Sequence, residues 1–350
     1  MDDQVGHPVG SDEWLNHVFR ARVRQRLFGS HSPRSEGPVL VLLGGQPAAG
    51  KTQAQRAILA EHPDDDLVEV TGDDLRVFHP DYITLTREHP FLMPNTTAPI
   101  SGGLVRLAVE HAHKRRYSLL LEGTFRDPGM VTGTAARFAD AGYRVEVAAV
   151  ATPAVVSRLS AEMRSLAGGL PAVGRWTPPA AHESALEHSP EVVAALEALP
   201  HVARVQVFSR ERLLYANTRT DTGAWERPAE AARVLHTEQH RRLGDVEAVA
   251  WLRDYAAVFA QAAARPGYLG PETAPTYLRL QTNAEGMIRS LMFTPGAPAG
   301  ELQRQQRERH AHLRRVLPPE LIPARRTAPP QRFSGPSAQA PNREPPTRGL

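Results

Sequence analysis

The stretch PVLVLLGGQPAAGKT, residues 38–52, joins an apolar run to a turn rich in glycine. The run PVLVLL has the length and composition of a buried strand, and the residues after the turn follow helical spacing. Gly45 and Gly50, followed by Lys51 and Thr52, match the spacing of a phosphate-binding loop between a strand and a helix. Because glycine has no side chain, backbone N–H groups there can approach phosphate oxygens closely. The stretch therefore predicts an α/β protein that binds a nucleotide.

Two side chains of the loop have predicted roles of their own. Lys51 would reach the terminal phosphates, and the hydroxyl of Thr52 would coordinate Mg²⁺. The helix that starts at Lys51 adds the positive end of its dipole. A chance match by a glycine-rich turn is the alternative interpretation. We predict that ATP is bound by the whole loop: Gly45, Gln46, Pro47, Ala48, Ala49, Gly50, Lys51 and Thr52.

Apolar runs alternate with helical patterns through the first half of the chain. An amphipathic helix that packs against the domain is expected at residues 11–28, before the first strand. Strands separated by helices in this rhythm predict a mostly parallel sheet with right-handed crossovers, flanked by helices. The expected strands after the first are 66–71, 117–123 and 143–151, and the expected helices are 51–62, 101–115 and 130–141.

After residue 152 the pattern loosens. Helices are expected at 153–169, at 191–199 and in the alanine-rich region 226–263, with a strand or hairpin at 201–218. The end of the chain is rich in Pro, Arg and Ser, a composition that cannot bury enough apolar surface to fold. The expected organisation is an N-terminal helical segment (1–36), a kinase-like domain (37–225), a helical extension (226–317) and a disordered tail (318–350).

The overall composition limits the classes of function. The chain has no cysteine, which excludes disulfides, thiolate nucleophiles and cysteine-ligated zinc. Its 41 Lys and Arg against 38 Asp and Glu do not suggest a nucleic-acid partner. No window has the length of a membrane span, and the acidic start differs from a secretory signal, so neither a membrane association nor export is expected. We expect a cytoplasmic protein.

Polar residues follow the second and third strands, where ligands of a parallel sheet collect. Asp73 follows the second strand, and Glu122, Thr124 and Arg126 follow the third. A carboxylate there can accept the proton of an attacking alcohol, and an arginine can neutralise charge on the transferring phosphoryl group. Position therefore marks Asp73 as a candidate base and Arg126 as a candidate substrate-binding residue, with Glu122 and Thr124 at the same edge of the sheet.

Structural interpretations of these residues stay open. Asp73 or Asp74 could cap the helix that begins near Leu75. Glu122 could be an acid of the Mg²⁺ shell, as in many phosphate-loop proteins, and Arg126 could be a surface charge. His79 is expected to be packed or to cap a turn, and His111 and His113 to be solvated. Residues 88–103 are interpreted as a loop because they contain three prolines. Asn95, Thr96 and Thr97 could hydrogen-bond a sugar or serve only the backbone of that loop.

The motifs GGQPAAGKT, GDDLRVFHPDY, LLLEGTFR and GRWTPPAAHE together resemble the zeta toxin family, phosphate-loop kinases of bacterial toxin–antitoxin systems. The resemblance covers roughly residues 38–200. It implies ATP and Mg²⁺ as cofactors, the nucleotide sugar UDP-N-acetylglucosamine as the small-molecule substrate, phosphorylated on a sugar hydroxyl, and an antitoxin protein as a partner.

The resemblance also implies roles for single residues. Lys51 and Thr52 match the nucleotide and metal positions, Asp73 the general base, and Glu122 and Thr124 the residues that hold the sugar nucleotide. Arg164 and Arg175 match catalytic arginines that clamp the phosphates. Two positions depart from the family pattern: Ala48 stands where a glycine is common, which is a mild change, and Ser165 where a tyrosine is usual.

Two other functions remain open at this point. A related kinase could act on another nucleotide-linked alcohol, such as a dinucleotide. A non-catalytic ATP-binding module could instead bind a protein through residues 226–350. Asp73 with Glu122 and Thr124 favours a kinase, because a scaffold needs no base beside the phosphates.

Overall fold

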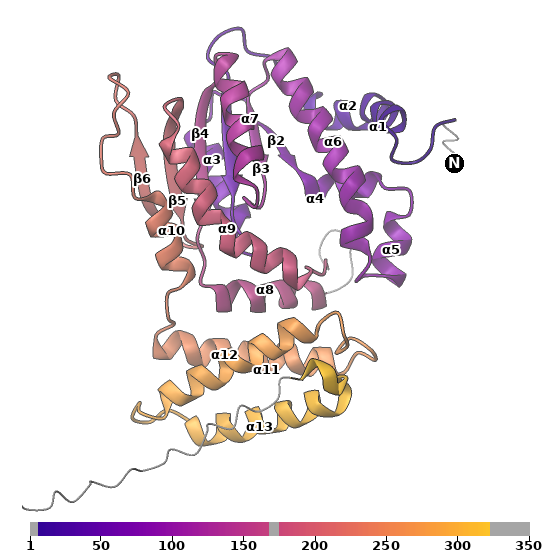
Figure 1. The fold of residues 1–350 in the computed structure, drawn as a ribbon, viewed down its shortest axis with the longest axis vertical. Coiled ribbons are helices and arrows are strands. Elements are labelled where there is room, and N and C mark those ends of the chain that lie inside the picture. The colour runs from indigo at the N-terminus through magenta and orange to yellow at the C-terminus, as the bar shows by residue number, and fades with distance from the viewer. Residues whose placement is uncertain (1–5, 168–174, 323–350) are drawn as a thin grey trace, which may run out of the picture.

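The computed structural model describes residues 6–167 and 175–322, which form a six-stranded sheet, flanking helices and a separate layer of helices (Figure 1). The strand order is β2-β3-β1-β4-β5-β6; neighbours from β2 to β5 are parallel, and β6 is antiparallel to β5. This confirms the predicted α/β fold with a mostly parallel sheet, and residues 201–218 form a hairpin. The strands are Val39–Gly44, Val68–Thr71, Leu119–Glu122, Arg144–Val150, Val202–Phe208 and Leu213–Thr218.

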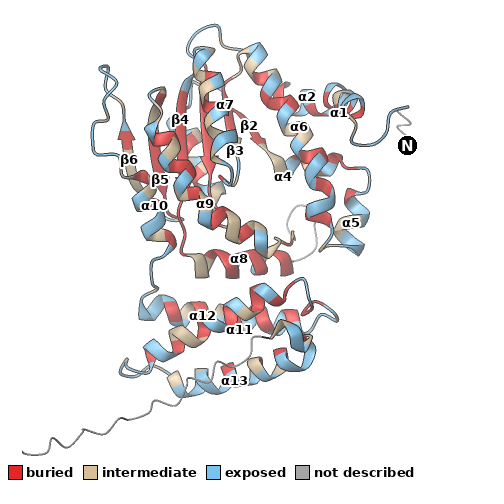
Figure 2. Cartoon of the chain, in the orientation of Figure 1, coloured by how far each residue is buried: buried red, intermediate tan, exposed pale blue. Residues whose placement is uncertain are grey.

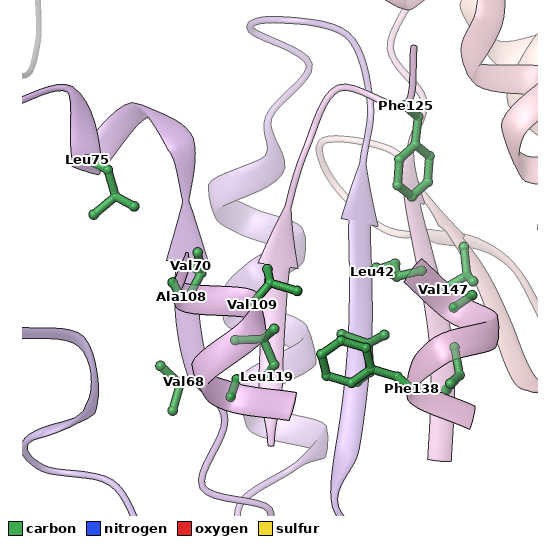
Figure 3. Packing of buried hydrophobic residues seen from close by; sticks show 14 of the residues in the cluster. Leu42, Val68, Val70, Leu75, Ala108, Val109, Leu119, Phe125, Phe138 and Val147 are labelled. Atoms are coloured by element: carbon green, nitrogen blue, oxygen red, sulfur yellow. The ribbon is translucent and has the colours of Figure 1, made fainter. Parts of the chain in front are cut away.

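The central strand β1 is buried on both faces, as its unbroken apolar sequence predicts. Val39, Val41 and Leu43 pack with Ile58 of helix α3 (Lys51–Glu61). Leu40 and Leu42 belong to the larger core on the other face, where α6 (Met93–Arg115), α7 (Pro128–Asp140) and α9 (Pro179–Ala198) contribute. Figure 3 shows part of this core, with Phe138 of α7 and Val109 of α6 above the strands.

The N-terminal helices pack on the domain, as predicted. They are α1 (Asp12–Val18), a π-helical turn (Phe19–Val23) and α2 (Arg24–Phe28). Ser11 caps α1 by accepting from the N–H of Trp14. Leu15 packs against Gly103 of α6, where a Cβ atom would lie 2.6 Å from its Cδ1. A side chain at position 103 would therefore require Leu15 to shift, and glycine lets α1 pack closely on α6 without that shift.

The prediction of a loop at residues 88–103 was wrong. Helix α5 (Tyr82–Glu88) is followed almost at once by α6, which starts at Met93. Pro94 lies in the first turn of α6, where its missing N–H leaves no hydrogen bond unmade. Thr97 is fully buried and its hydroxyl donates to the carbonyl of Met93, so it supports the helix.

The histidines of α6 are also less exposed than predicted. The ring of His111 lies 4.8 Å from that of Phe28, and the ring of His113 lies 5.0 Å from that of Phe138. Both are half-buried aromatic packing residues rather than solvated ones. His79 is packed and its Nδ1 accepts from the N–H of Asp81, as predicted.

Three further helices complete the part of the molecule that surrounds the sheet. After β2 the chain forms α4 (Gly72–Leu75) and a 3₁₀ turn (Arg76–Phe78), and after β4 it forms α8 (Ala154–Leu166). Helix α10 (Ala231–Gln239) packs with the sheet core through Ala231 and Leu235. The alanine-rich region is thus not one helix, because α10 ends before α11 begins.

Residues 245–322, which we term the C-terminal module, form a second core beyond α8, away from the sheet (Figures 1 and 2). Its helices are α11 (Asp245–Ala263), α12 (Ala274–Leu291) and α13 (Ala299–Val316), and Leu159 and Leu166 of α8 pack into it. Residues 318–322, expected to be disordered, contain a 3₁₀ turn (Pro319–Leu321) whose Leu321 and Ile322 pack on the module. The remainder of the predicted tail, 323–350, lies outside the described residues.

Within residues 6–167 and 175–322, none of the helices has both the length and the apolar character that a membrane span requires.

Candidate active site

A large cleft opens at the carboxyl ends of β1, β2 and β3. Its volume is about 1110 Å³, and its walls are the phosphate-loop end of α3, the turn after β2, α6, the turn after β3, and α7. Arg164 of α8 and the segment Arg175–Thr177 also line it. The predicted residues that line this single cleft are Pro47, Lys51, Asp73, Glu122, Thr124, Arg126, Arg164 and Arg175.

The loop between β1 and α3 has the backbone that a phosphate cradle needs. Gly45 has φ +150° and Gly50 has φ +102°, conformations that side chains rarely adopt. A Cβ atom on Gly45 would lie 2.8 Å from the carbonyl oxygen of Val150 in the neighbouring strand. Ala48 also has a left-handed backbone, with φ +57°. Alanine at position 48, where the family commonly has glycine, therefore carries backbone strain of about 1 kcal/mol.

Buried polar contacts hold this loop from outside. The Gln46 side chain is fully buried, donates to the carbonyl of Thr152 and accepts from Gln239 of α10. The hydroxyl of Thr152 donates to the carbonyl of Ala49. Arg210, in the turn after β5, donates to the carbonyl of Ala48. Sequence reasoning missed these supports, because Thr152, Arg210 and Gln239 lie far along the chain and belong to no local motif.

Lys51 lies at the start of α3 and points back over the loop. Its Nζ donates to the carbonyls of Gly45 (3.2 Å) and Gln46 (3.4 Å) and lies 3.7 Å from Glu122 Oε1. Burial lowers the pKa of Lys51, and the carboxylates of Glu122 and Asp73 oppose this effect. The ammonium group is thus held at the loop and available for an anion.

Asp73 lies in α4, directly after β2. Its Oδ1 accepts from Arg76 Nε at 3.0 Å, and its Oδ2 lies 2.8 Å from an Nη of Arg175. Burial acts to raise the pKa of Asp73, but the charges of Arg175, Arg76 and Arg164 hold the pKa below its ordinary value. The residue that precedes α4 as its N-cap is Thr71. The contacts of the Asp73 carboxylate are therefore those of a charged group facing arginines across the cleft.

Arg76 is a site residue that sequence reasoning did not single out. Beside its bond to Asp73, it donates to the carbonyl of Pro94 (2.7 Å) and the hydroxyl of Thr97 (2.6 Å). Arg76 follows Asp73 by three residues, and on a helix this spacing places the two side chains side by side, so the pair could have been predicted from the sequence. Arg76 fixes Asp73 against α6.

Glu122 ends β3 and pairs with Thr71, the last residue of β2, so it lies beside the strand that leads into Asp73. Burial raises the pKa of Glu122, with Lys51 acting in the opposite direction. Phe125, labelled in Figure 3, takes a left-handed backbone (φ +49°). Its ring packs on Gly44 of β1, where a Cβ atom would lie 2.1 Å from the ring. With Phe125 buried, its neighbours Thr124 and Arg126 line the cleft.

Arg164 and Arg175 come from different segments and meet at the cleft. An Nη of Arg164 donates to the hydroxyl of Thr177 at 3.1 Å. The Nε of Arg164 is buried and has no hydrogen-bond partner among the described residues. Burial and the charge of Arg175 lower the pKa of Arg164. Two arginines with a free donor can neutralise an anion that carries more than one charge.

No group of three or more Asp, Glu or His in the described part of the chain could hold a metal ion by itself. Thr52 is exposed at the first turn of α3 and does not line the cleft. A divalent ion with a single protein hydroxyl would need phosphate oxygens and waters as its other ligands, and Mg²⁺ in proteins commonly keeps several waters beside substrate phosphates. The residues present fit Mg²⁺ only as a companion of a bound polyphosphate.

Comparison with known proteins gives consistent results. The zeta toxin family model matches residues 22–220. Toxin PezT of Streptococcus pneumoniae is 31% identical over 214 residues, which cover 61% of this chain and 83% of PezT. Toxin zeta of Enterococcus hirae is 26% identical over 59% of this chain and 75% of its own length. A solved structure of the S. pneumoniae PezAT toxin–antitoxin system matches with a TM-score of 0.57 and 26% identity, over 71% of this chain and 97% of that chain.

Proposed function

This chain belongs to the zeta toxin family, whose members are kinase-like toxins, and we propose that it is an ATP-dependent kinase of a nucleotide sugar. The acceptor that we propose is UDP-N-acetylglucosamine, phosphorylated on a sugar hydroxyl. The observation that carries the proposal is the position of Asp73: its carboxylate lines the same cleft as Lys51 and contacts Arg175.

Each group in the cleft has a part in this reaction. The loop N–H groups and Lys51 bind the phosphates, while Arg164 and Arg175 neutralise the oxygens of the γ-phosphoryl group. The acceptor hydroxyl oxygen bonds to the γ-phosphorus as the bond to the β,γ-bridging oxygen breaks and ADP leaves. The hydroxyl proton passes to Asp73, whose carboxylate oxygens each keep a lone pair beside their arginine contacts.

The low pKa of Asp73 shapes its role. A carboxylate held ionised by three arginines is a weak base toward a free alcohol, so it takes the proton once the oxygen–phosphorus bond is forming. Before that, Asp73 orients the hydroxyl. Positioning and electrostatic stabilisation then supply most of the rate, as is usual in phosphoryl transfer.

Mg²⁺, when bound, would neutralise charge on the phosphates, and Thr52 is the residue that we propose as its protein ligand. Glu122, Thr124 and Arg126 are the proposed acceptor-binding residues. The cleft of about 1110 Å³ exceeds what one triphosphate needs, and this favours a second ligand of nucleotide size.

We also propose an antitoxin protein as a partner. The matched PezAT structure is that of a toxin–antitoxin system. A partner that covers the open cleft would prevent turnover.

Transfer itself tests the proposal. The full-length protein is incubated with ATP, Mg²⁺ and a panel of UDP-sugars and dinucleotides. The mass of each acceptor is then measured by mass spectrometry. We expect a gain of one phosphate on UDP-N-acetylglucosamine. If only a dinucleotide gains the mass of a phosphate, the acceptor is a dinucleotide and not the nucleotide sugar. If no compound gains this mass although the protein binds ATP, a non-catalytic ATP-binding module is favoured.

A further inference from the structure

The C-terminal module contacts the helix that carries Arg164, although the family match ends at residue 220. Trp251 Nε1 donates to the carbonyl of Val155 at the start of α8, at 2.9 Å. Arg265 donates to the carbonyl of Leu166 at the end of α8. The module therefore holds both ends of α8 by hydrogen bonds, in addition to the apolar contacts of its core.

Tyr268, between α11 and α12, makes the contact nearest to Arg164. It is buried, and its hydroxyl lies 3.0 Å from Glu162 Oε2 and 2.9 Å from Ser165 Oγ. Ser165 is the next residue after Arg164, and Glu162 lies two residues before it. The hydroxyl thus fixes the turn of α8 from which the Arg164 side chain projects into the cleft.

The ring of Tyr268 also reaches the second arginine. Its centroid lies 5.5 Å from that of Phe91, and the Phe91 ring lies 5.1 Å from that of Trp176. Trp176 follows Arg175 and is buried in the wall of the cleft. One side chain of the module is therefore linked by short contacts to both arginine-bearing segments.

The two arginines repel each other, and Asp73 offsets this repulsion only in part: its carboxylate contacts Arg175 at 2.8 Å, whereas it acts on Arg164 by its charge alone. Each arginine carries a positive charge, and the charge of Arg175 disfavours the charged form of Arg164. The hydrogen bond from Arg164 to Thr177 is a single neutral-acceptor contact. Contacts on the other side of α8 can therefore oppose the repulsion between the two guanidinium groups.

We propose that Tyr268 is a positioning residue of the phosphoryl transfer, holding Arg164 and Arg175 at the separation that the transferring phosphoryl group requires. The inference rests on the proposed function, in which these arginines contact that group. The C-terminal module would then contribute to catalysis although it lies outside the cleft.

A transition-state mimic tests this without knowledge of the acceptor. The affinities of the full-length protein for ADP and for ADP with aluminium fluoride, both with Mg²⁺, are measured by titration calorimetry. Aluminium fluoride stands in for the transferring phosphoryl group, which the arginines face, whereas ADP is held by the loop. We expect Tyr268→Phe to weaken the aluminium fluoride complex by about tenfold and to leave ADP affinity within about twofold.

Two further variants separate positioning from general destabilisation. Arg265→Ala removes a donor to α8 from an exposed position and should act in the same direction, with Arg265→Lys restoring part of the loss. Tyr255→Phe is the matched control: it is a buried tyrosine of the same module whose hydroxyl has no partner among the described residues. It should bind both ligands like the wild type.

The outcomes are distinct. Wild-type affinity of Tyr268→Phe and Arg265→Ala for both ligands overturns the inference, as does an equal loss in Tyr255→Phe. If the wild-type protein binds ADP with the same affinity with and without aluminium fluoride, the proposed function is contradicted, and so is the inference that rests on it.

Discussion

The cleft and the C-terminal module differ in how they are encoded. The cleft is built from short motifs at the ends of adjacent parallel strands, so a few neighbouring residues specify each wall. The module touches the site through single side chains, such as Tyr268, whose partners lie about a hundred residues away. Local motifs reveal the chemistry of a site, whereas the parts that hold the site in place are visible only in three dimensions.

The largest expected effect lies in the phosphate loop. Lys51→Ala should weaken ATP binding and lower transfer by roughly 10³-fold, because the Lys51 ammonium lies over the loop and also lines the cleft. Calorimetry with ATP and a transfer assay measure both effects. Lys114, an exposed lysine of α6, gives the matched control as Lys114→Ala. Wild-type turnover of Lys51→Ala would contradict the assignment of this loop to phosphate binding.

Asp73→Asn should keep ATP affinity and lower transfer by about 10²–10⁴-fold, since it removes the proton acceptor while the loop stays intact. Asp74→Asn is the matched control, because Asp74 is its exposed neighbour in α4. Equal turnover in both variants would return Asp73 to a purely structural role.

The contact between α8 and the C-terminal module, where Tyr268 donates to Glu162, should affect the pH dependence of stability. Burial raises the pKa of Glu162 to about 7, against an ordinary value of 4.5. Between these values the folded protein keeps a proton that the unfolded chain has lost, so the free energy of unfolding falls as the pH rises through this window. Glu162→Gln should remove about 3 kcal/mol of that fall.

Urea unfolding of the wild type and Glu162→Gln at pH 5 and pH 8 measures this difference. The variant should be more stable relative to the wild type at pH 8 than at pH 5. A constant difference between the two proteins would show that Glu162 ionises in the folded state as it does in the unfolded chain.

The smallest effect is expected from the strained loop residue. Ala48→Gly should raise the free energy of unfolding by up to about 1 kcal/mol, because glycine adopts φ +57° without steric cost. Ala49→Gly is the control: Ala49 is fully buried and does not have a positive φ, so its substitution should destabilise. A destabilised Ala48→Gly protein would contradict the strain that we assign to this position.

Much of the fold and part of the site could be predicted from the sequence. The strands follow from buried apolar runs, and the positions of Asp73 and Glu122 in the cleft follow from the edge that parallel strands share. The helix through residues 93–103 could not be read locally, because its prolines indicated a loop while burial of Thr97 and its contact with Arg76 favour the helix. Arg210 and Gln239 support the loop from distant segments, and no local pattern marks them.

The most direct measurement is a crystal structure of the protein with a non-hydrolysable ATP analogue, Mg²⁺ and UDP-N-acetylglucosamine. The proposed function predicts one sugar hydroxyl within hydrogen-bonding distance of Asp73, on the side of the γ-phosphorus opposite the bridging oxygen to ADP. A sugar bound with every hydroxyl away from Asp73, or outside the cleft, would contradict it.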